Sequence, residues 1–349
     1  PQRRVPVSVT MPKRCAEYLF SYYAAWAKVE HGGFGDSDAK LLPLTSVDLA
    51  REYVQFRERL DAQAVIKPHG LTCTAQNSFG NPHLSGRRPV AILVLGPSAS
   101  GKTYSTQMHV EDVLRANGLD EGLCFHSIDG GLMRDEGVSR VWTELGRVRD
   151  AVRERKKVVD HSQHCAGQDE DPFFGFADAY SKVGQPASRP LKSKLLKDAM
   201  IEMRNLVLVD TAASCSTANV LKAIVKTFSC KAWAQYEALA QSGYNVIMTA
   251  VNADRGNCDH QGARRSKAEG KVYEGKHWKA SMEAVRDMFN AAREGGNRNT
   301  FFIFDNNDHG QLPRSQRRAS GVTVVSPTEK VHMTWVRKDE AVDFISVSR

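Results

Sequence analysis

The sequence has few cysteines and no long hydrophobic run, and both absences narrow the class of protein. Seven cysteines in 349 residues lack the paired spacings of a disulfide-rich or metal-binding domain. We therefore expect reduced thiols in an intracellular setting. No apolar segment approaches the roughly 18 residues of a membrane-spanning helix, so we expect no membrane partner.

The sequence also lacks internal repeats, low-complexity tracts and a concentrated basic segment. Its composition, 41% hydrophobic and 25% charged residues, is that of an ordinary globular protein. The net charge is +8, but lysine and arginine are scattered, whereas nucleic-acid binders usually gather them on one face. We therefore expect no nucleic-acid partner. Scattered positive charge around one cleft would suit a small, phosphate-rich substrate.

The chain divides by pattern into a helical N-terminal region, residues 1–89, and an α/β domain, residues 90–349. In the second part, continuous apolar runs alternate with helical stretches, which predicts a mostly parallel sheet flanked by helices. One of these helices, 218–241, ends before Gly243. Two Gly-, Asn- and Arg-rich segments, 252–276 and 305–321, are predicted to be long loops, and about 254–276 a lid. Short alternating stretches after Gly321 predict added C-terminal strands. The predicted buried strands are 91–95, 123–128, 206–209, 245–251 and 301–304.

A phosphate-binding loop, "GPSASGKT", follows the first of these strands and precedes a helix. It matches G-x-x-x-x-G-K-[ST] at every fixed position. The glycines let backbone N–H groups turn toward phosphate oxygens, and the following helix adds its N-terminal dipole. Lysine reaches the β- and γ-phosphates in such loops, and the threonine hydroxyl holds Mg²⁺. The predicted ATP–Mg²⁺ residues are Gly96, Ser98, Ala99, Ser100, Gly101, Lys102 and Thr103.

An aspartate, Asp129, stands at the end of the next predicted strand. Ligands of open α/β sheets bind at the carboxyl ends of strands. A carboxylate there can accept the proton of an acceptor hydroxyl during phosphoryl transfer; the alternative is a helix cap or turn former. The GTPase signature N/T-K-x-D is absent, because "VNAD" at 251–254 lacks the lysine. The sequence therefore favours a kinase over a switch.

Three further residues are candidates for binding the acceptor. Asp210 and Thr211 follow the third strand, where an acid either holds Mg²⁺ through water, as in a Walker B motif, or hydrogen-bonds the acceptor. The sequence leaves both roles open. Arg134 lies five residues after Asp129 and either neutralises acceptor phosphates or forms a surface ion pair.

An arginine pair, Arg264 and Arg265, lies in the segment after the fourth strand, "NADRGNCDHQGARRSKAEGKVYEGKHW". Phosphoryl transfer spreads negative charge over three equatorial oxygens, and arginines on a closing segment stabilise that charge. We therefore assign both arginines to catalysis.

The order of these motifs resembles the zeta-toxin kinases over residues 90 to 310. The resemblance rests on "LVLGPSASGKT", Asp129 with Arg134, "VLVDTAAS", "GYNVIMTAVNADR", "GARRSKAEGKVYEGKHW" and "FFIFDNND". It implies a P-loop kinase fold, ATP–Mg²⁺ on Lys102 and Thr103, and Asp129 as the base. It implies phosphate sensors around Arg264 and Arg265, and it places Asp305 and Asn306 beside the adenine.

Within that family, the sequence is most similar to the AvrRxo-type effectors of plant-pathogenic xanthomonads. This resemblance implies phosphorylation of NAD at the 3′-hydroxyl of its adenosine ribose, and a small antitoxin-like chaperone as partner. It also implies type III secretion from the bacterial cytoplasm into the host plant cell, with virulence action in the host cytoplasm. Family members that phosphorylate UDP-N-acetylglucosamine place a Pro and a Tyr soon after the arginine, and "DGGLMRDEGVSRVW" has neither. A UDP-N-acetylglucosamine kinase and a P-loop NTPase switch remain the alternatives.

Overall fold

The computed structural model comprises two compact units, each of which is described by itself. The unit with the phosphate loop, here called the sheet unit, contains Leu60–Asp129, Lys194–Gly262 and Glu274–Arg349. The second unit contains Pro1–Arg59, Gly130–Ser193 and Ala263–Tyr273. The residues that the structure describes are 65–80, 87–129, 185–215, 230–269, 273, 275–307, 321–338 and 340–348. Across these ranges no helix has the length and apolar character needed to cross a membrane.

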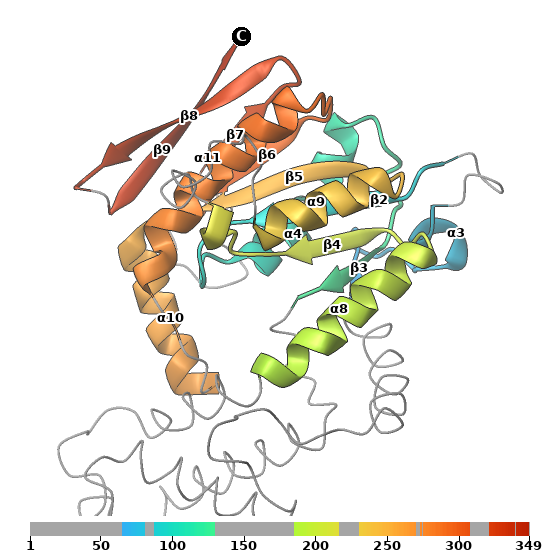
Figure 1. Ribbon diagram of the computed structural model, residues 1–349, viewed down its shortest axis with the longest axis horizontal. Coiled ribbons are helices and arrows are strands. Elements are labelled where there is room, and N and C mark those ends of the chain that lie inside the picture. The colour runs from blue at the N-terminus through green and yellow to red at the C-terminus, as the bar shows by residue number, and fades with distance from the viewer. Residues whose placement is uncertain are drawn as a thin grey trace, which may run out of the picture. The chain divides into compact units, whose positions relative to one another are not determined.

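The sheet unit is built on a seven-stranded sheet in the order β1-β3-β4-β2-β5-β6-β7 (Figure 1). The five inner strands are parallel, and the two edge strands β1 and β7 run antiparallel to their neighbours. The predicted α/β class is therefore confirmed. The strands are β1 (Val65–Ile66), β2 (Val90–Leu95), β3 (Phe125–Ile128), β4 (Leu206–Val209), β5 (Asn245–Asn252), β6 (Phe301–Asp305) and β7 (Gly321–Val325).

The inner strands are apolar because both faces of the sheet are covered. All six residues of β2 are buried, as expected for a central parallel strand. Phe302 and Phe304 of β6 belong to the core beneath α4 (Lys102–Ala116), where His109 stacks on Phe304 at 4.6 Å between ring centroids. On the opposite face Phe301 meets Phe289 of α11 (Trp278–Glu294). α9 (Lys231–Gln241) also contacts β5 (Figure 1).

The strand order makes β2 the turning point of the sheet. From β2 the chain passes through α4 to β3 and then β4 on one side, and only afterwards to β5 and β6 on the other. Such a switch point leaves a crevice at the carboxyl ends of the strands, where ligands bind. The phosphate loop follows β2 and therefore lies at the carboxyl ends of the parallel strands.

The predicted C-terminal strands are confirmed and divide between two sheets. β7 extends the main sheet, whereas β8 (Glu329–Val336) and β9 (Ala341–Ser348) form a separate hairpin. Asn290 of α11 fixes this hairpin, since its side chain donates to Val331 O at 2.9 Å and accepts from Val331 N at 2.8 Å.

The C-terminal hairpin is also tied to the end of β5. Asn252 Nδ2 donates to Val342 O at 2.8 Å, and Arg255 N donates to Glu340 O at 2.8 Å. The last strand of the chain thus supports the loop edge of the main sheet.

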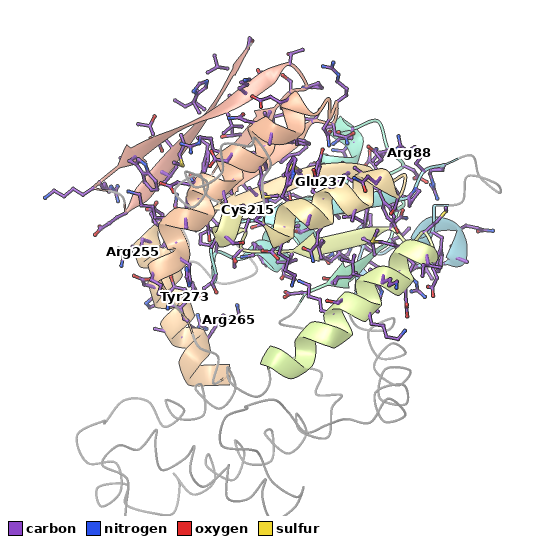
Figure 2. All side chains as sticks on the ribbon, in the orientation of Figure 1. Arg88, Cys215, Glu237, Arg255, Arg265 and Tyr273 are labelled. Atoms are coloured by element: carbon purple, nitrogen blue, oxygen red, sulfur yellow. A yellow bond between two sulfur atoms is a disulfide. The ribbon has the colours of Figure 1, made fainter. Side chains whose placement is uncertain are left out.

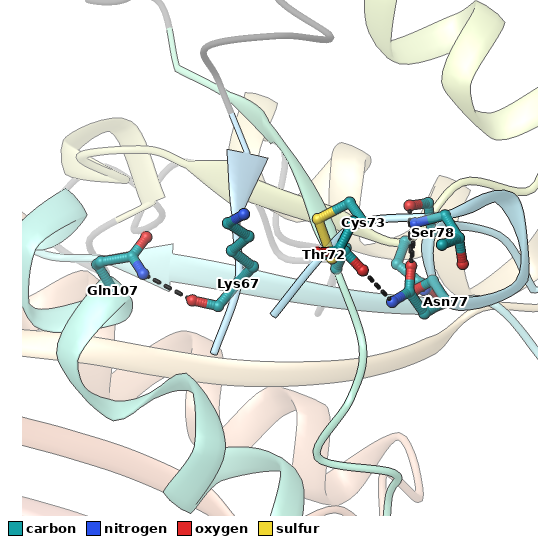
Figure 3. Close-up of a disulfide and its surroundings, with 9 residues drawn as sticks. Lys67, Thr72, Cys73, Asn77, Ser78 and Gln107 are labelled. Atoms are coloured by element: carbon teal, nitrogen blue, oxygen red, sulfur yellow. Dashed lines mark hydrogen bonds between the residues drawn. A yellow bond between two sulfur atoms is a disulfide. The ribbon is translucent and has the colours of Figure 1, made fainter. Parts of the chain in front are cut away.

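Two disulfides correct the expectation of reduced thiols. Cys73 is joined to Cys124 (Figure 3), and Cys215 is joined to Cys230. Cys258 is the free cysteine of the described residues, and it is buried. The partners lie 51 and 15 residues apart in the sequence. They meet only because separate elements pack together, which cysteine spacing does not reveal.

The first predicted loop, residues 252–276, contains the helix α10 (Arg255–Glu269) and the short helix η5 (Gly275–His277). The loop prediction is therefore wrong for this segment. α10 is mostly polar, and Cys258 is one of its few buried side chains. It therefore lacks the apolar stripe by which an amphipathic helix is recognised.

The remaining described helices are α3 (Ala75–Ser78), α8 (Gln185–Ile201) and η3 (Ala213–Cys215). Of the predicted helix 218–241, the part from Lys231 is α9, which ends before Gly243 as expected. Gly243 has φ +85°, the left-handed conformation usual after a helix. Residues 218–229 of that helix, and all of residues 1–64 and 308–320, lie outside the described residues.

Candidate active site

The phosphate loop has a backbone that only glycine can adopt at two positions. Gly96 has φ +138°, and a Cβ there would lie 2.7 Å from Val251 O. Gly101 has φ +88°, and a Cβ there would lie 2.5 Å from Asn306 Nδ2. Ala99, between them, also has a positive φ of 63°. The loop is therefore curled tightly against the ends of β5 and β6.

The two charged partners of a phosphate, a helix N-terminus and an ammonium group, meet at this loop. α4 starts at Lys102, and Ser105 N donates to Gly101 O at 2.9 Å in its first turn. Lys102 Nζ donates to Gly96 O at 2.8 Å and to Pro97 O at 2.6 Å. The positive charge of Lys102 and the helix dipole thus both lie where a phosphate group would bind.

The loop's small residues differ in exposure. Ser98 is exposed, whereas Ser100 is buried. The Ser100 hydroxyl has no hydrogen-bond partner within the described residues. A buried polar group of this kind usually finds a partner, so a phosphate oxygen or water at the loop would satisfy it.

Asp129 and Thr103 are brought together although 26 residues separate them. Thr103 Oγ1 donates to Asp129 Oδ2 at 3.2 Å. β4 lies between β3 and β2, so Asp129 is one strand removed from the loop strand. The two side chains supply hard oxygen atoms, which Mg²⁺ prefers. Asp129 therefore lies beside the residue predicted to hold the metal, and its role as the base stays a prediction.

Asp210 lies directly beside the loop strand. Its N–H donates to Val94 O at 3.0 Å, because β4 pairs with β2. Its Oδ1 accepts from Ala212 N at 2.8 Å, which stabilises a turn in which Ala212 has φ +53°. Asp210 and Thr211 are both half-buried. This position suits a Walker B acid and an acceptor ligand equally, so the role of Asp210 stays open.

Asn306 contacts the loop itself. Its Nδ2 donates to Ser100 O at 2.6 Å, and its N–H donates to Asn252 O at 2.8 Å. The expected position of Asp305 and Asn306 beside the adenine stays a prediction. The neighbouring Asn307, which sequence reasoning missed, accepts hydrogen bonds from Asp254 N and Asn257 Nδ2 at the start of α10. The run of polar residues "DNND" directly after an apolar strand is the signal that could have drawn attention to it.

The three predicted arginines are not part of the described sheet unit that carries the phosphate loop. Arg134 lies outside the described residues. Arg264 and Arg265 are exposed residues of α10, and Figure 2 labels Arg255 and Arg265 on that helix. They belong to the second unit, so their role as phosphate sensors stays a prediction.

Cys258 is an inert thiol near the loop. Burial raises its pKa to about 12, an effect that the nearby Lys102 charge opposes. Its Sγ contacts Ala253 O at 3.8 Å, and Trp278 Nε1 donates to the same oxygen at 2.8 Å. A protonated, buried thiol is a poor nucleophile, so we assign Cys258 to packing.

The residues and the topology together define a P-loop nucleotide-binding site in an α/β sheet. No protein-family model and no curated protein matches the chain. Among solved structures, a protein of the PezAT chromosomal toxin–antitoxin system of Streptococcus pneumoniae is similar at 13% identity. The match covers 84% of this chain and 83% of that one, with a TM-score of 0.42.

Two structures of a complex between AvrRxo1-ORF1 and AvrRxo1-ORF2 are also similar. The one with sulphate ions has 9% identity, a TM-score of 0.40, and coverage of 79% of this chain and 66% of that chain. The native complex has 10% identity, a TM-score of 0.39, and coverage of 85% and 70%. These are the groups that the motif order resembles, and the likeness concerns the fold alone.

Proposed function

We propose that the chain is an ATP- and Mg²⁺-dependent kinase of a small molecule, with NAD as the acceptor. The observation that carries this proposal is the 3.2 Å contact between Thr103 Oγ1 and Asp129 Oδ2 beside the phosphate loop. Transfer to a hydroxyl needs a group that accepts its proton, and Asp129 is a carboxylate at the loop that can take this role. A switch would use a carboxylate here only to help hold Mg²⁺, and it would release ADP without an acceptor.

In the proposed reaction, the 3′-hydroxyl oxygen of the adenosine ribose attacks the γ-phosphorus of ATP. The bond between that phosphorus and the β–γ bridging oxygen breaks, ADP leaves, and the hydroxyl proton passes to Asp129. Lys102 and the loop N–H groups stabilise the charge on the phosphates. Thr103 would hold Mg²⁺, which neutralises the β- and γ-phosphate oxygens when bound. Arg264 and Arg265 are assigned to the transferring group, and Arg134, Asp210 and Thr211 to the acceptor.

The choice of NAD, the partner and the site of action rest on the family resemblance. We propose a small antitoxin-like chaperone as the partner, and action as a secreted virulence factor in the cytoplasm of a host plant cell. The similar structures come from a toxin–antitoxin system and from a complex of AvrRxo1-ORF1 with AvrRxo1-ORF2, which is a reason to look for such a partner.

An acceptor screen tests the proposed function. The purified chain is incubated with ATP and Mg²⁺ and with NAD, with UDP-N-acetylglucosamine, or with no acceptor, and product masses are recorded. We expect phosphorylated NAD, with the position of the phosphate fixed by NMR. Phosphorylated UDP-N-acetylglucosamine would show that the UDP-sugar, and not NAD, is the acceptor. Release of ADP without any acceptor would show that the protein is a P-loop NTPase switch and not a kinase.

A pair of lysine variants controls this screen. Lys102→Ala should abolish turnover, because the ammonium group at the loop is lost. Lys194→Ala is the matched control, since Lys194 forms an exposed ion pair with Asp198, and such pairs contribute little. If Lys102→Ala kept its activity, the assigned nucleotide site would be wrong.

A further inference from the structure

Asn306 holds one peptide group of the phosphate loop in a fixed orientation. Its carboxamide donates to Ser100 O at 2.6 Å. Its own main chain is fixed to β5 through the 2.8 Å bond to Asn252 O. A Cβ on Gly101 would lie only 2.5 Å from the same Nδ2 atom. Asn306 therefore has both a hydrogen bond and a tight steric contact with the same short stretch of the loop.

The orientation of Ser100 O determines the orientation of Gly101 N–H. The two belong to one peptide group, which is planar and trans, so its C=O and N–H bonds point in opposite directions. Because Ser100 O points at Asn306, Gly101 N–H points away from Asn306. In loops of this kind, backbone N–H groups directed inward bind phosphate oxygens.

Asn307 holds the start of α10 by hydrogen bonds, as Asn306 holds the phosphate loop. Its Oδ1 accepts from Asp254 N, and its main-chain oxygen accepts from Asn257 Nδ2. Its Nδ2 donates to Asp305 Oδ1, which fixes the side chain in turn. Adjacent residues after β6 thus bind two different elements of the sheet unit, the phosphate loop and the first turn of α10.

We propose that Asn306 is a positioning residue for the phosphate loop and does not read the adenine base. It holds the Ser100–Gly101 peptide so that Gly101 N–H is available to a nucleotide phosphate, whichever base the nucleotide carries. The inference rests on the proposed function only in assuming that the loop binds nucleotide phosphates. It departs from the role beside adenine that the family resemblance implies.

Binding measurements with three ligands test this role. The ligands are ATP, GTP and inorganic tripolyphosphate, each with Mg²⁺, titrated calorimetrically into the wild type, Asn306→Ser and Asn306→Asp. Loss of one hydrogen bond to the loop should weaken all three ligands by a similar factor, about 5- to 20-fold for Asn306→Ser. Asn306→Asp should weaken them further, because a carboxylate cannot donate to Ser100 O and repels the phosphates. The KM for the acceptor should stay unchanged in both variants.

Asn290→Asp is the matched control, since Asn290 also holds main-chain groups, those of Val331 in the hairpin. It should lower the melting temperature without changing the affinity for tripolyphosphate. If Asn306→Asp does not fold, the affinities of Asn306→Ser for the three ligands decide whether Asn306 positions the loop or contacts the base.

Weaker binding of ATP alone, with GTP and tripolyphosphate unchanged, would overturn the proposal and assign Asn306 to the base. A wild type that binds none of the three ligands would instead contradict the proposed function.

Discussion

The two sides of the nucleotide site are held in place by different kinds of contact. The donor side, Gly96–Thr103 with Asn306, is fixed by packing and hydrogen bonds from distant strands. The proposed acceptor side, formed by the ends of β3 and β4 with Asp129 and Asp210, has one disulfide close to it in the chain, because Cys215 follows Asp210 by five residues and is joined to Cys230. The Cys73–Cys124 disulfide lies at the other end of β3, since Cys124 immediately precedes that strand and Asp129 follows it.

This difference explains why the two sides are unequally visible in the sequence. The donor side needs particular residues at fixed spacing, because glycine alone fits where the backbone is left-handed and crowded. The proposed acceptor side needs only a carboxylate at the end of a strand, and the disulfide that follows Asp210 joins cysteines that no motif identifies. We therefore expect that a substitution can damage one side and leave the other intact.

The largest effect is expected from Asp129→Asn. Loss of the proton acceptor should lower kcat by about 10²- to 10⁴-fold, while the dissociation constant of ATP–Mg²⁺ changes less than the rate. Steady-state kinetics and calorimetric titration measure the two quantities. Asp112→Asn, at an exposed carboxylate paired with Arg115, should leave both unchanged. An unaltered rate in Asp129→Asn would contradict the assignment of the base.

The next largest effect is expected from removing the disulfides, which should lower the free energy of unfolding. In the chain-entropy model, the Cys73–Cys124 link, with a separation of 51 residues, contributes about 4 kcal/mol, and the Cys215–Cys230 link, with a separation of 15, about 3 kcal/mol. The double variants Cys73→Ser/Cys124→Ser and Cys215→Ser/Cys230→Ser should lose free energy of unfolding in that order, as measured by urea denaturation.

The Cys215–Cys230 disulfide can also be used to test whether the two sides are independent. Cys215 N donates to Ala212 O at 2.8 Å, so opening the bond to Cys230 loosens the turn that carries Asp210. Cys215→Ser/Cys230→Ser should raise the acceptor KM and leave ATP affinity unchanged. A weaker ATP complex with an unchanged acceptor KM would contradict the separation of the two sides.

A pair of glycine variants tests the donor side with a smaller expected effect. Gly101 and Gly243 have φ +88° and +85°, but only Gly101 has an atom within 4 Å of its missing Cβ. Both Gly→Ala changes should therefore cost about 1–2 kcal/mol of stability from backbone strain. Only Gly101→Ala should also weaken ATP, by roughly tenfold, because Asn306 must move. Equal ATP affinities in the two variants would show that the contact is unimportant.

The smallest effect is expected at Cys258, a buried residue of α10. Its pKa is raised to about 12 from 9.0 by burial, so at pH 8 the thiol is protonated and should resist iodoacetamide. The raised pKa adds stability below pH 9 that is lost as the pH rises toward 12. Mass spectrometry of the Cys258 peptide should find it unmodified in the native protein and modified in urea. Rapid native labelling at pH 8 would contradict this.

Much of the fold could be predicted because its strands are buried on both sides. The apolar runs from Ala91 to Phe304 correspond to β2 through β6, with ends shifted by one or two residues. The two-residue strand β1 and the polar helix α10 were missed, because neither has enough apolar periodicity to be recognised.

The candidate site could be predicted only where a motif constrains it. Residues Gly96 to Thr103 follow from the loop pattern, and Asp129 from its place at a strand end. The contact of Asn306 with Ser100 joins residues 206 positions apart, and the disulfides likewise join separate elements. No local pattern encodes such contacts, because they depend on how the sheet is ordered.

The bonds from the end of β5 to Glu340 and Val342 have a consequence for biosynthesis. Ribosomes release a chain from its N-terminus onward, and domains generally fold as they emerge. The phosphate loop is synthesised well before Asn306 and before Glu340 and Val342, which bind Arg255 and Asn252. A nascent chain therefore carries the loop before its supports exist, and the nucleotide site is completed only after Val342 has been synthesised.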